Sequence, residues 1–226
     1  MDDHASLGAI LLAGGRATRV DGAAKHLFDV GGRTLLERAV AAAASAGAQP
    51  IVVVGPRPAD LRLSHVRWVR EDPPFRGPAA GIVAGLAVTA LSTAARTDPE
   101  WTLVLACDLP DVQSAVTRLM RDIPLLPSDT DGVCLADATS RPQWLIGAYR
   151  TSALRRAATA LADGGRDASV RALRAGLAIA VVTAPATETA DIDTWQDLEN
   201  ARRRYATAEE SPIPQDSIHP APKESP

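Results

Sequence analysis

Cysteine is nearly absent from the 226-residue sequence. The two that occur, Cys107 and Cys134, lie in apolar runs and form no CxxC or Cys/His spacing. We therefore expect two reduced core thiols in a cytoplasmic protein, and neither a disulfide framework nor a zinc site. Long hydrophobic runs are absent too, since none approaches the roughly 18 residues of a membrane-spanning helix. The acidic start, Met1-Asp2-Asp3-His4, lacks the pattern of a secretory signal.

An excess of positive charge is also missing. The sequence has 24 lysine and arginine residues against 27 aspartate and glutamate residues, which gives a net charge of −3 at pH 7. This balance excludes a broad cationic surface for nucleic acid or for an anionic membrane. No G-x-S-x-G or H-E-x-x-H motif occurs, and no histidine lies in register with a carboxylate or a cysteine. These absences argue against triad hydrolysis and zinc chemistry.

Lysine is scarce, because only Lys25 and Lys223 occur and all the other cationic side chains are arginines. Lys223 falls in a proline-rich terminal stretch, so Lys25 is the only lysine of the expected folded region. An ammonium group is a compact point charge on a flexible stem, and it can enter a crowded phosphate site that a planar guanidinium does not fit. We favour a functional role for Lys25 over placement by chance.

The sequence does contain an apolar fraction of 46%, enough for a buried core, and it alternates strand-like with helix-like segments. The expected strands are Leu7–Ala13, Pro50–Gly55, Val66–Val69, Trp101–Cys107, Asp131–Ala136, Gln143–Tyr149 and Leu177–Thr183. The expected helices are Thr34–Ala46, Ala80–Ala94, Val112–Asp122, Ser152–Ala162, Ala168–Ala175 and Thr194–Tyr205. This alternation predicts a three-layer α/β/α fold with a mostly parallel, doubly wound sheet. We expect the domain to span residues 6–206, followed by a disordered, proline-rich tail over residues 207–226.

A glycine turn follows the first expected strand, in the run Leu12-Ala13-Gly14-Gly15-Arg16-Ala17-Thr18-Arg19. Ligands of parallel sheets bind at the carboxyl ends of the strands, and glycines there let backbone N–H groups approach a phosphate closely. The nearby arginines and Lys25 form a local cationic cluster suited to a triphosphate. The alternative is a tight strand-to-helix turn with solvated arginines. The spacing matches neither G-x-G-x-x-G nor a P-loop, which disfavours both kinds of nucleotide site.

Carboxylates occur at several places where predicted elements begin or end. Asp108 ends a buried strand and is well placed for Mg²⁺, a hard cation that takes oxygen ligands together with nucleotide phosphates. Asp111 is better placed than Asp108 to cap the following helix. Asp193 is either a second metal ligand or, with Gln196, the start of a capping box. Asp72 either contacts a ribose or a base, or shapes a turn beside two prolines.

Taken in order, these motifs resemble nucleotidyltransferases with a GT-A-like fold, and among them the molybdenum cofactor guanylyltransferase family. The resemblance covers about Leu7 to Arg204. It is carried by Leu12-Ala13-Gly14-Gly15, Arg19, Lys25, Gly31-Gly32-Arg33-Thr34-Leu35-Leu36, Gly77-Pro78-Ala79-Ala80-Gly81-Ile82, Cys107-Asp108-Leu109-Pro110, Arg141-Pro142-Gln143-Trp144-Leu145, Gly164-Gly165-Arg166-Asp167 and Asp193-Thr194. The sequence departs from the family pattern at Val20, Ala24 and Gly55, where Met, Asp and Asn are common.

The resemblance implies roles for individual residues. Nucleotide binding is assigned to Leu12, Ala13, Gly14, Gly15, Lys25, Asp72 and Asp108. The metal ligands expected for Mg²⁺ are Asp108 and Asp193. The residues expected to support catalysis are Arg19, Lys25 and Asp108, because cations and a metal neutralise charge on the departing pyrophosphate.

The implied reaction moves GMP from GTP to the phosphate of molybdopterin, or of the molybdenum cofactor, and releases pyrophosphate. A phosphate monoester is already nucleophilic near neutral pH, so no general base is required. Transient contacts with proteins of cofactor biosynthesis or with molybdoenzymes are implied as well. The alternatives are the same chemistry with CTP or another phosphorylated acceptor, a non-catalytic nucleotide or pterin carrier, and an NAD-binding oxidoreductase that the glycine spacing disfavours.

Overall fold

The centre of the protein is a seven-stranded sheet. The computed structural model describes residues 5–14, 20, 22–72, 74, 76–90 and 98–209. The strands of this sheet are β1 (Leu7–Leu12), β4 (Ile51–Val54), β5 (Val66–Val69), β6 (Trp101–Ala106), β7 (Gly132–Ala136), β8 (Pro142–Arg150) and β9 (Ile179–Thr183). Their order across the sheet is β5-β4-β1-β6-β8-β7-β9. β1 pairs in parallel with β4 and β6, whereas β8 runs antiparallel to β6 and β7. The predicted α/β class with a mostly parallel sheet is confirmed.

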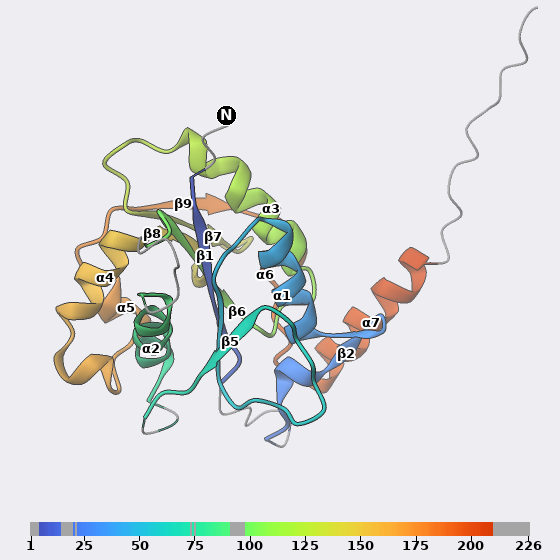
Figure 1. Ribbon diagram of the computed structural model, residues 1–226. Coiled ribbons are helices and arrows are strands. Elements are labelled where there is room, and N and C mark those ends of the chain that lie inside the picture. Colours follow the sequence, from blue (N-terminus) through green and yellow to red (C-terminus); the bar gives the residue numbers. More distant parts are fainter. Residues whose placement is uncertain are drawn as a thin grey trace, which may run out of the picture.

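Helices cover both faces of the sheet (Figure 1). One face carries α1 (Leu35–Ser45), α3 (Val112–Asp122), the short turn η3 (Ile123–Leu125) and α6 (Ala186–Thr189). The other face carries α2 (Pro78–Ala90), α4 (Thr151–Thr159), η4 (Ala162–Gly165) and α5 (Val170–Leu173). Because side chains alternate along a strand, Leu11 of β1 packs into the first core and Ile10 into the second. A strand buried on both faces reads as a continuous apolar run, which is why β1 was visible in the sequence.

Helix α2 packs unusually close to the central strand. A Cβ atom added at Gly85 would lie 2.7 Å from Cγ2 of Ile10, a distance at which atoms must move. The glycine therefore allows the helix backbone to approach β1. This close packing brings the start of α2, at Pro78, next to the carboxyl ends of the strands.

A small third core supports the region around Lys25. The hairpin of β2 (Asp29–Val30) and β3 (Arg33–Thr34) turns through two glycines with positive φ. The C-terminal helix α7 (Trp195–Glu209) packs against this hairpin. The buried members of this core are Val30, Leu35, Ile192, Leu198 and Ala201. The hairpin thus contacts a helix that lies more than 160 positions further along the sequence.

Several expected boundaries differ from the structure. α2 begins at Pro78 rather than Ala80, and the expected continuation to residue 94 lies outside the described residues. The helix expected over 168–175 is only the single turn α5. α7 continues to Glu209, past the expected end of the domain at residue 206, and the rest of the expected tail lies outside the described residues. Among the helices described, none combines the length and apolarity that a bilayer crossing requires.

Candidate active site

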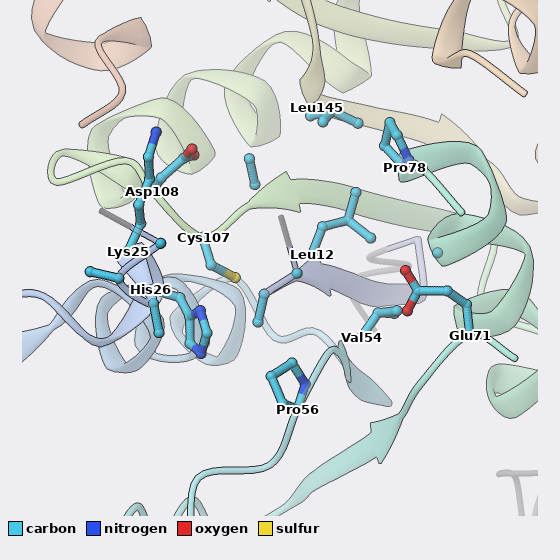
Figure 2. A pocket seen from close by; sticks show the side chains of 18 of the residues that line it. Leu12, Lys25, His26, Val54, Pro56, Glu71, Pro78, Cys107, Asp108 and Leu145 are labelled. Atoms are coloured by element: carbon cyan, nitrogen blue, oxygen red, sulfur yellow. The ribbon is translucent and has the colours of Figure 1, made fainter. Parts of the chain in front are cut away.

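A cavity of about 750 Å³ opens at the carboxyl ends of β1, β4 and β6. Figure 2 shows Lys25 and Asp108 together at one end, Glu71 at the other, and Leu12 and Cys107 between them. This is the edge of a parallel sheet at which ligands bind. The predicted nucleotide-binding residues that line the cavity are Leu12, Ala13, Gly14, Lys25 and Asp108. Gly15 and Arg19 lie outside the described residues.

Backbone hydrogen bonds attach the end of β1 to β4 and to the residue that follows β6. The N–H of Ala13 donates to the carbonyl oxygen of Val54 at 2.8 Å, and the N–H of Cys107 donates to that of Leu12 at 3.2 Å. Gly55 has a φ of +153°, and a Cβ atom there would lie 2.9 Å from the carbonyl carbon and oxygen of Ala13. A glycine is therefore needed for β4 to pass this close to the turn. The result is an immobilised backbone that places Gly14 at the cavity wall.

Lys25 begins the 3-10 turn η2 (Lys25–Leu27), whose carbonyl at Lys25 accepts from the N–H of Phe28 at 2.9 Å. Its ammonium group forms a close ion pair with the carboxylate of Asp193, a residue 168 positions away in the sequence. The Lys25 side chain is only 16% exposed. The structure therefore brings together a predicted phosphate-binding cation and a predicted metal ligand.

Asp108 lies in the same group of charges. Burial, together with the negative charge of Asp191, raises the pKa of Asp108 to about 6, while Lys25 opposes this rise. Burial and the neighbouring Asp193 carboxylate likewise raise the pKa of Asp191. Three carboxylates and one ammonium group thus share this end of the site. Such a group has a net affinity for further positive charge.

Asp193 does not cap the last helix through Gln196, as one interpretation of the sequence had it. The cap is Thr194, whose hydroxyl accepts from the N–H of Asp197 at 3.2 Å. The Asp197 carboxylate accepts in return from the N–H of Thr194 at 2.8 Å. This capping box lies one residue further along the chain. The Asp193 carboxylate pairs with Lys25 instead.

The structure separates Asp72 from the main cavity. Asp72 is exposed and lines a smaller neighbouring cavity of about 210 Å³. Glu71 lines both cavities, and in Figure 2 it closes the end opposite Lys25. Of the two carboxylates after β5, Glu71 thus lines the main cavity and Asp72 only the smaller one, and nucleoside binding by Asp72 stays a prediction.

Sequence reasoning missed other lining residues. His26 is buried, its Nε2 has no hydrogen-bond partner among the described residues, and burial lowers its pKa so that the neutral imidazole is favoured. Leu145 of β8 and Pro78 of α2 form the wall above the strands in Figure 2. Both residues lie in segments that carry the family resemblance, but neither was assigned an individual role in ligand binding. An apolar residue gives no signal of its own that distinguishes a pocket wall from a core.

Asp167, which also lines the cavity, forms two hydrogen bonds with Arg76. The N–H of Asp167 donates to the carbonyl oxygen of Arg76 at 3.0 Å, and the Arg76 guanidinium donates back to the Asp167 carboxylate at 2.9 Å. Asp167 has a φ of +57°, which is uncommon for a residue other than glycine. These contacts fix the segment that precedes α2 against the segment that follows η4.

The acidic residues fit a magnesium ion that is shared with a ligand. Within the described ranges, no three His, Cys, Asp or Glu side chains are arranged to hold a metal by themselves. Mg²⁺ rarely uses such a set, because it keeps several waters and binds through one or two carboxylates plus substrate phosphates. Asp108 and Asp193, both interacting with Lys25, are hard oxygen donors of the kind that such an arrangement would use.

Solved structures share this architecture. A nucleotidyl transferase from Methanothermobacter superposes with a TM-score of 0.66 at 23% identity, covering 90% of this chain and 99% of its own. The 2-C-methyl-D-erythritol 4-phosphate cytidylyltransferase from Thermus thermophilus has a TM-score of 0.55 at 20% identity, covering 88% and 98%. Both likenesses concern the fold. The sheet and the helices that cover it therefore have the α/β fold of these two nucleotidyltransferases.

Sequence comparison narrows this class. The model of the MobA-like NTP transferase domain matches residues 9–180. A probable molybdenum cofactor guanylyltransferase from Opitutus terrae is 31% identical over 208 residues, covering 89% of this chain and 97% of its own. A protein of the same name from Synechococcus elongatus is 34% identical over 166 residues, covering 70% and 79%. The chain belongs to the family of MobA-like NTP transferases, and it is an enzyme of the nucleotidyltransferase class.

Proposed function

We propose that the protein transfers a guanylyl group from GTP to the terminal phosphate of molybdopterin, or of its molybdenum-bearing form. The observation that carries this proposal is the convergence of Gly14, Lys25 and Asp108 on one cavity at the strand ends. The names of the relatives in Opitutus terrae and Synechococcus elongatus support the choice of guanylyl transfer to this acceptor.

The nucleotide is proposed to lie along the cavity with its triphosphate at the Lys25 end. Leu12, Ala13 and Gly14 line the cavity, and we assign contacts with the nucleotide to their backbone groups. Glu71 at the opposite end is a carboxylate, which only accepts hydrogen bonds when ionised. Guanine presents two adjacent donors, N1–H and N2–H₂, and a carboxylate can accept from both. We therefore assign the nucleoside contact to Glu71 in preference to Asp72.

Positive charge at the triphosphate end comes from Lys25 and, by the sequence pattern, from Arg19. The ammonium of Lys25 can neutralise charge that accumulates on the departing pyrophosphate. Asp108 and Asp193 would hold Mg²⁺ together with phosphate oxygens, and the bound ion would neutralise the triphosphate.

The chemistry then needs orientation more than acid–base catalysis. An oxygen of the acceptor phosphate forms a bond to the α-phosphorus of GTP, and the bond from that phosphorus to the β-phosphate oxygen breaks. Pyrophosphate leaves with the electron pair. Because the phosphate nucleophile is already ionised near neutral pH, a positioned base is unnecessary.

A pyrophosphate-release assay tests the proposal. The full chain is incubated with Mg²⁺ and GTP, CTP, ATP or UTP in turn, with and without molybdopterin. We expect pyrophosphate only when GTP and molybdopterin are both present, and no release in excess EDTA. Release with CTP in place of GTP would make the protein a cytidylyltransferase. Binding of GTP without release for any acceptor would make it a carrier.

A further inference from the structure

The contact between Lys25 and Asp193 joins two groups to which the proposed function gives different partners. Lys25 lines the cavity, whereas Asp193 belongs to the segment that precedes α7. Their ion pair is close, with side-chain exposures of 16% and 39%. In the free protein, therefore, the phosphate-binding cation is held by a metal-ligand carboxylate.

The position of Asp193 is imposed by its neighbours in the chain. The Ile192 side chain is 1% exposed in the core between the hairpin and α7. The following residue, Thr194, forms the helix cap with Asp197. The residues on both sides of Asp193 are thus fixed, and they hold its carboxylate beside Lys25.

The carboxylates at the Lys25 end of the cavity repel a triphosphate that has no bound cation. Lys25 interacts with Asp108 and Asp191 as well as with Asp193, so one ammonium group faces three carboxylates. A nucleotide that arrives without a cation adds negative charge to this group. It must also compete with Asp193 for the Lys25 ammonium group.

We propose that Asp193 is a positioning residue with two alternating partners, the Lys25 ammonium in the free protein and a divalent cation in the nucleotide complex. This inference rests on the proposed function. The cation takes the Asp193 carboxylate, and Lys25 is released to the phosphates in the same exchange. Nucleotide and cation therefore bind with positive coupling, because each removes a charge that would otherwise oppose the other.

The exchange has an unusual consequence for Asp193→Asn. The amide keeps the shape of the side chain but cannot form the ion pair, so Lys25 becomes available without a cation. The variant should bind GTP more tightly than the native protein when no metal is present, by at least about fivefold. It should also lose most of the tightening that Mg²⁺ produces, because one metal ligand is gone.

Isothermal titration calorimetry with GTP and the full chain measures the GTP affinity, once in excess EDTA and once in excess MgCl₂. Asp191→Asn is the matched control, since it removes one carboxylate of the same group without breaking the ion pair. We expect metal-free binding to improve markedly more in Asp193→Asn than in Asp191→Asn. Equal affinities in EDTA for these two variants would overturn the exchange.

The same comparison in a Lys25→Met variant shows whether the effect depends on the Lys25 ammonium group. In Lys25→Met there is no ammonium group to release, so adding Asp193→Asn should improve metal-free binding no more than Asp191→Asn does. If the extra gain persists without Lys25, the inference is wrong. If instead the native protein binds GTP in neither solution, the proposed function fails. Asp193→Ser replaces Asp193→Asn if thermal melting shows that the amide variant does not fold.

Discussion

The backbone N–H of Ile192 donates a hydrogen bond of 2.9 Å to the carbonyl oxygen of Asp108. This bond attaches the chain before α7 to the end of β6, so two segments far apart in the sequence bring their carboxylates to one place. Ile192 is also anchored in a buried core, which makes the attachment rigid. The acidic end of the cavity is therefore part of the fold rather than a property of a mobile loop.

Asp108→Ala should abolish most of the activity while the protein stays folded. Losing one group that stabilises developing charge typically costs roughly 10²–10³ in rate, and we expect at least that loss in kcat. Removing one of three neighbouring carboxylates relieves repulsion, so the melting temperature should not fall because of charge. Asp111→Asn is the control, because its carboxylate bonds the Tyr205 hydroxyl at 2.6 Å and does not line the cavity. Turnover of Asp108→Ala near the native rate would remove this residue from the mechanism.

Lys25→Ala should reduce kcat/KM by at least about 10²-fold, since the charge on the departing pyrophosphate loses its ammonium partner. Lys25→Arg keeps the charge but presents a planar group in place of a compact one, and we expect it to restore only part of the loss. Steady-state kinetics with GTP and molybdopterin measure both variants. Full activity in Lys25→Ala would contradict the assigned role.

Glu71→Gln and Asp72→Asn form a matched pair that compares the two carboxylates after β5. Glu71 lines the main cavity, whereas Asp72 is exposed beside it. We expect Glu71→Gln to raise the KM for GTP about tenfold and to weaken the preference for GTP over other nucleotides, because an amide accepts one guanine donor and repels the other. Asp72→Asn should change the KM less than about threefold. The reverse ranking would return the nucleoside contact to Asp72.

Gly85→Ala should destabilise the protein although alanine favours helices. The new methyl group would meet Ile10, which is fully buried and cannot yield easily. Overpacking costs about 1–3 kcal/mol, against about 1 kcal/mol gained in helix propensity. We therefore expect the free energy of unfolding to fall by about 1 kcal/mol in urea titration. Ala87→Gln, on the exposed side of α2, should change it by less than about 0.5 kcal/mol. Equal stability of the two variants would show that α2 can shift away from the sheet.

The strands could be predicted from the sequence because burial on both faces leaves a local signal. Ile51–Val54 and Leu103-Val104-Leu105 are apolar without interruption, and both are strands. The β2–β3 hairpin was not predicted, because strands of only two residues each leave no recognisable pattern in the sequence. The antiparallel direction of β8 between β6 and β7 had no local signal, because chain direction depends on how the connections cross the sheet.

Residues of the candidate site could be predicted from the sequence only where the residue type and its local position already indicated a role. The glycine turn, the isolated Lys25 and the strand-end Asp108 were each visible in the sequence, and Gly14, Lys25 and Asp108 line one cavity. The Lys25–Asp193 ion pair was not, because it joins residues 168 positions apart through a core that includes Ile192. The positions of Glu71 and Asp72 show the same limit: a turn can be located from its prolines, but which of two neighbouring carboxylates lines a cavity depends on tertiary packing.

Guanylyl transfer can be followed with GTP radiolabelled at the α-phosphorus. With the full chain, Mg²⁺ and molybdopterin, we expect the label to move into a pterin–guanine dinucleotide in amounts equal to the pyrophosphate released. Release of the label as GMP, or GTP that binds but keeps its label in the presence of the acceptor, would contradict it.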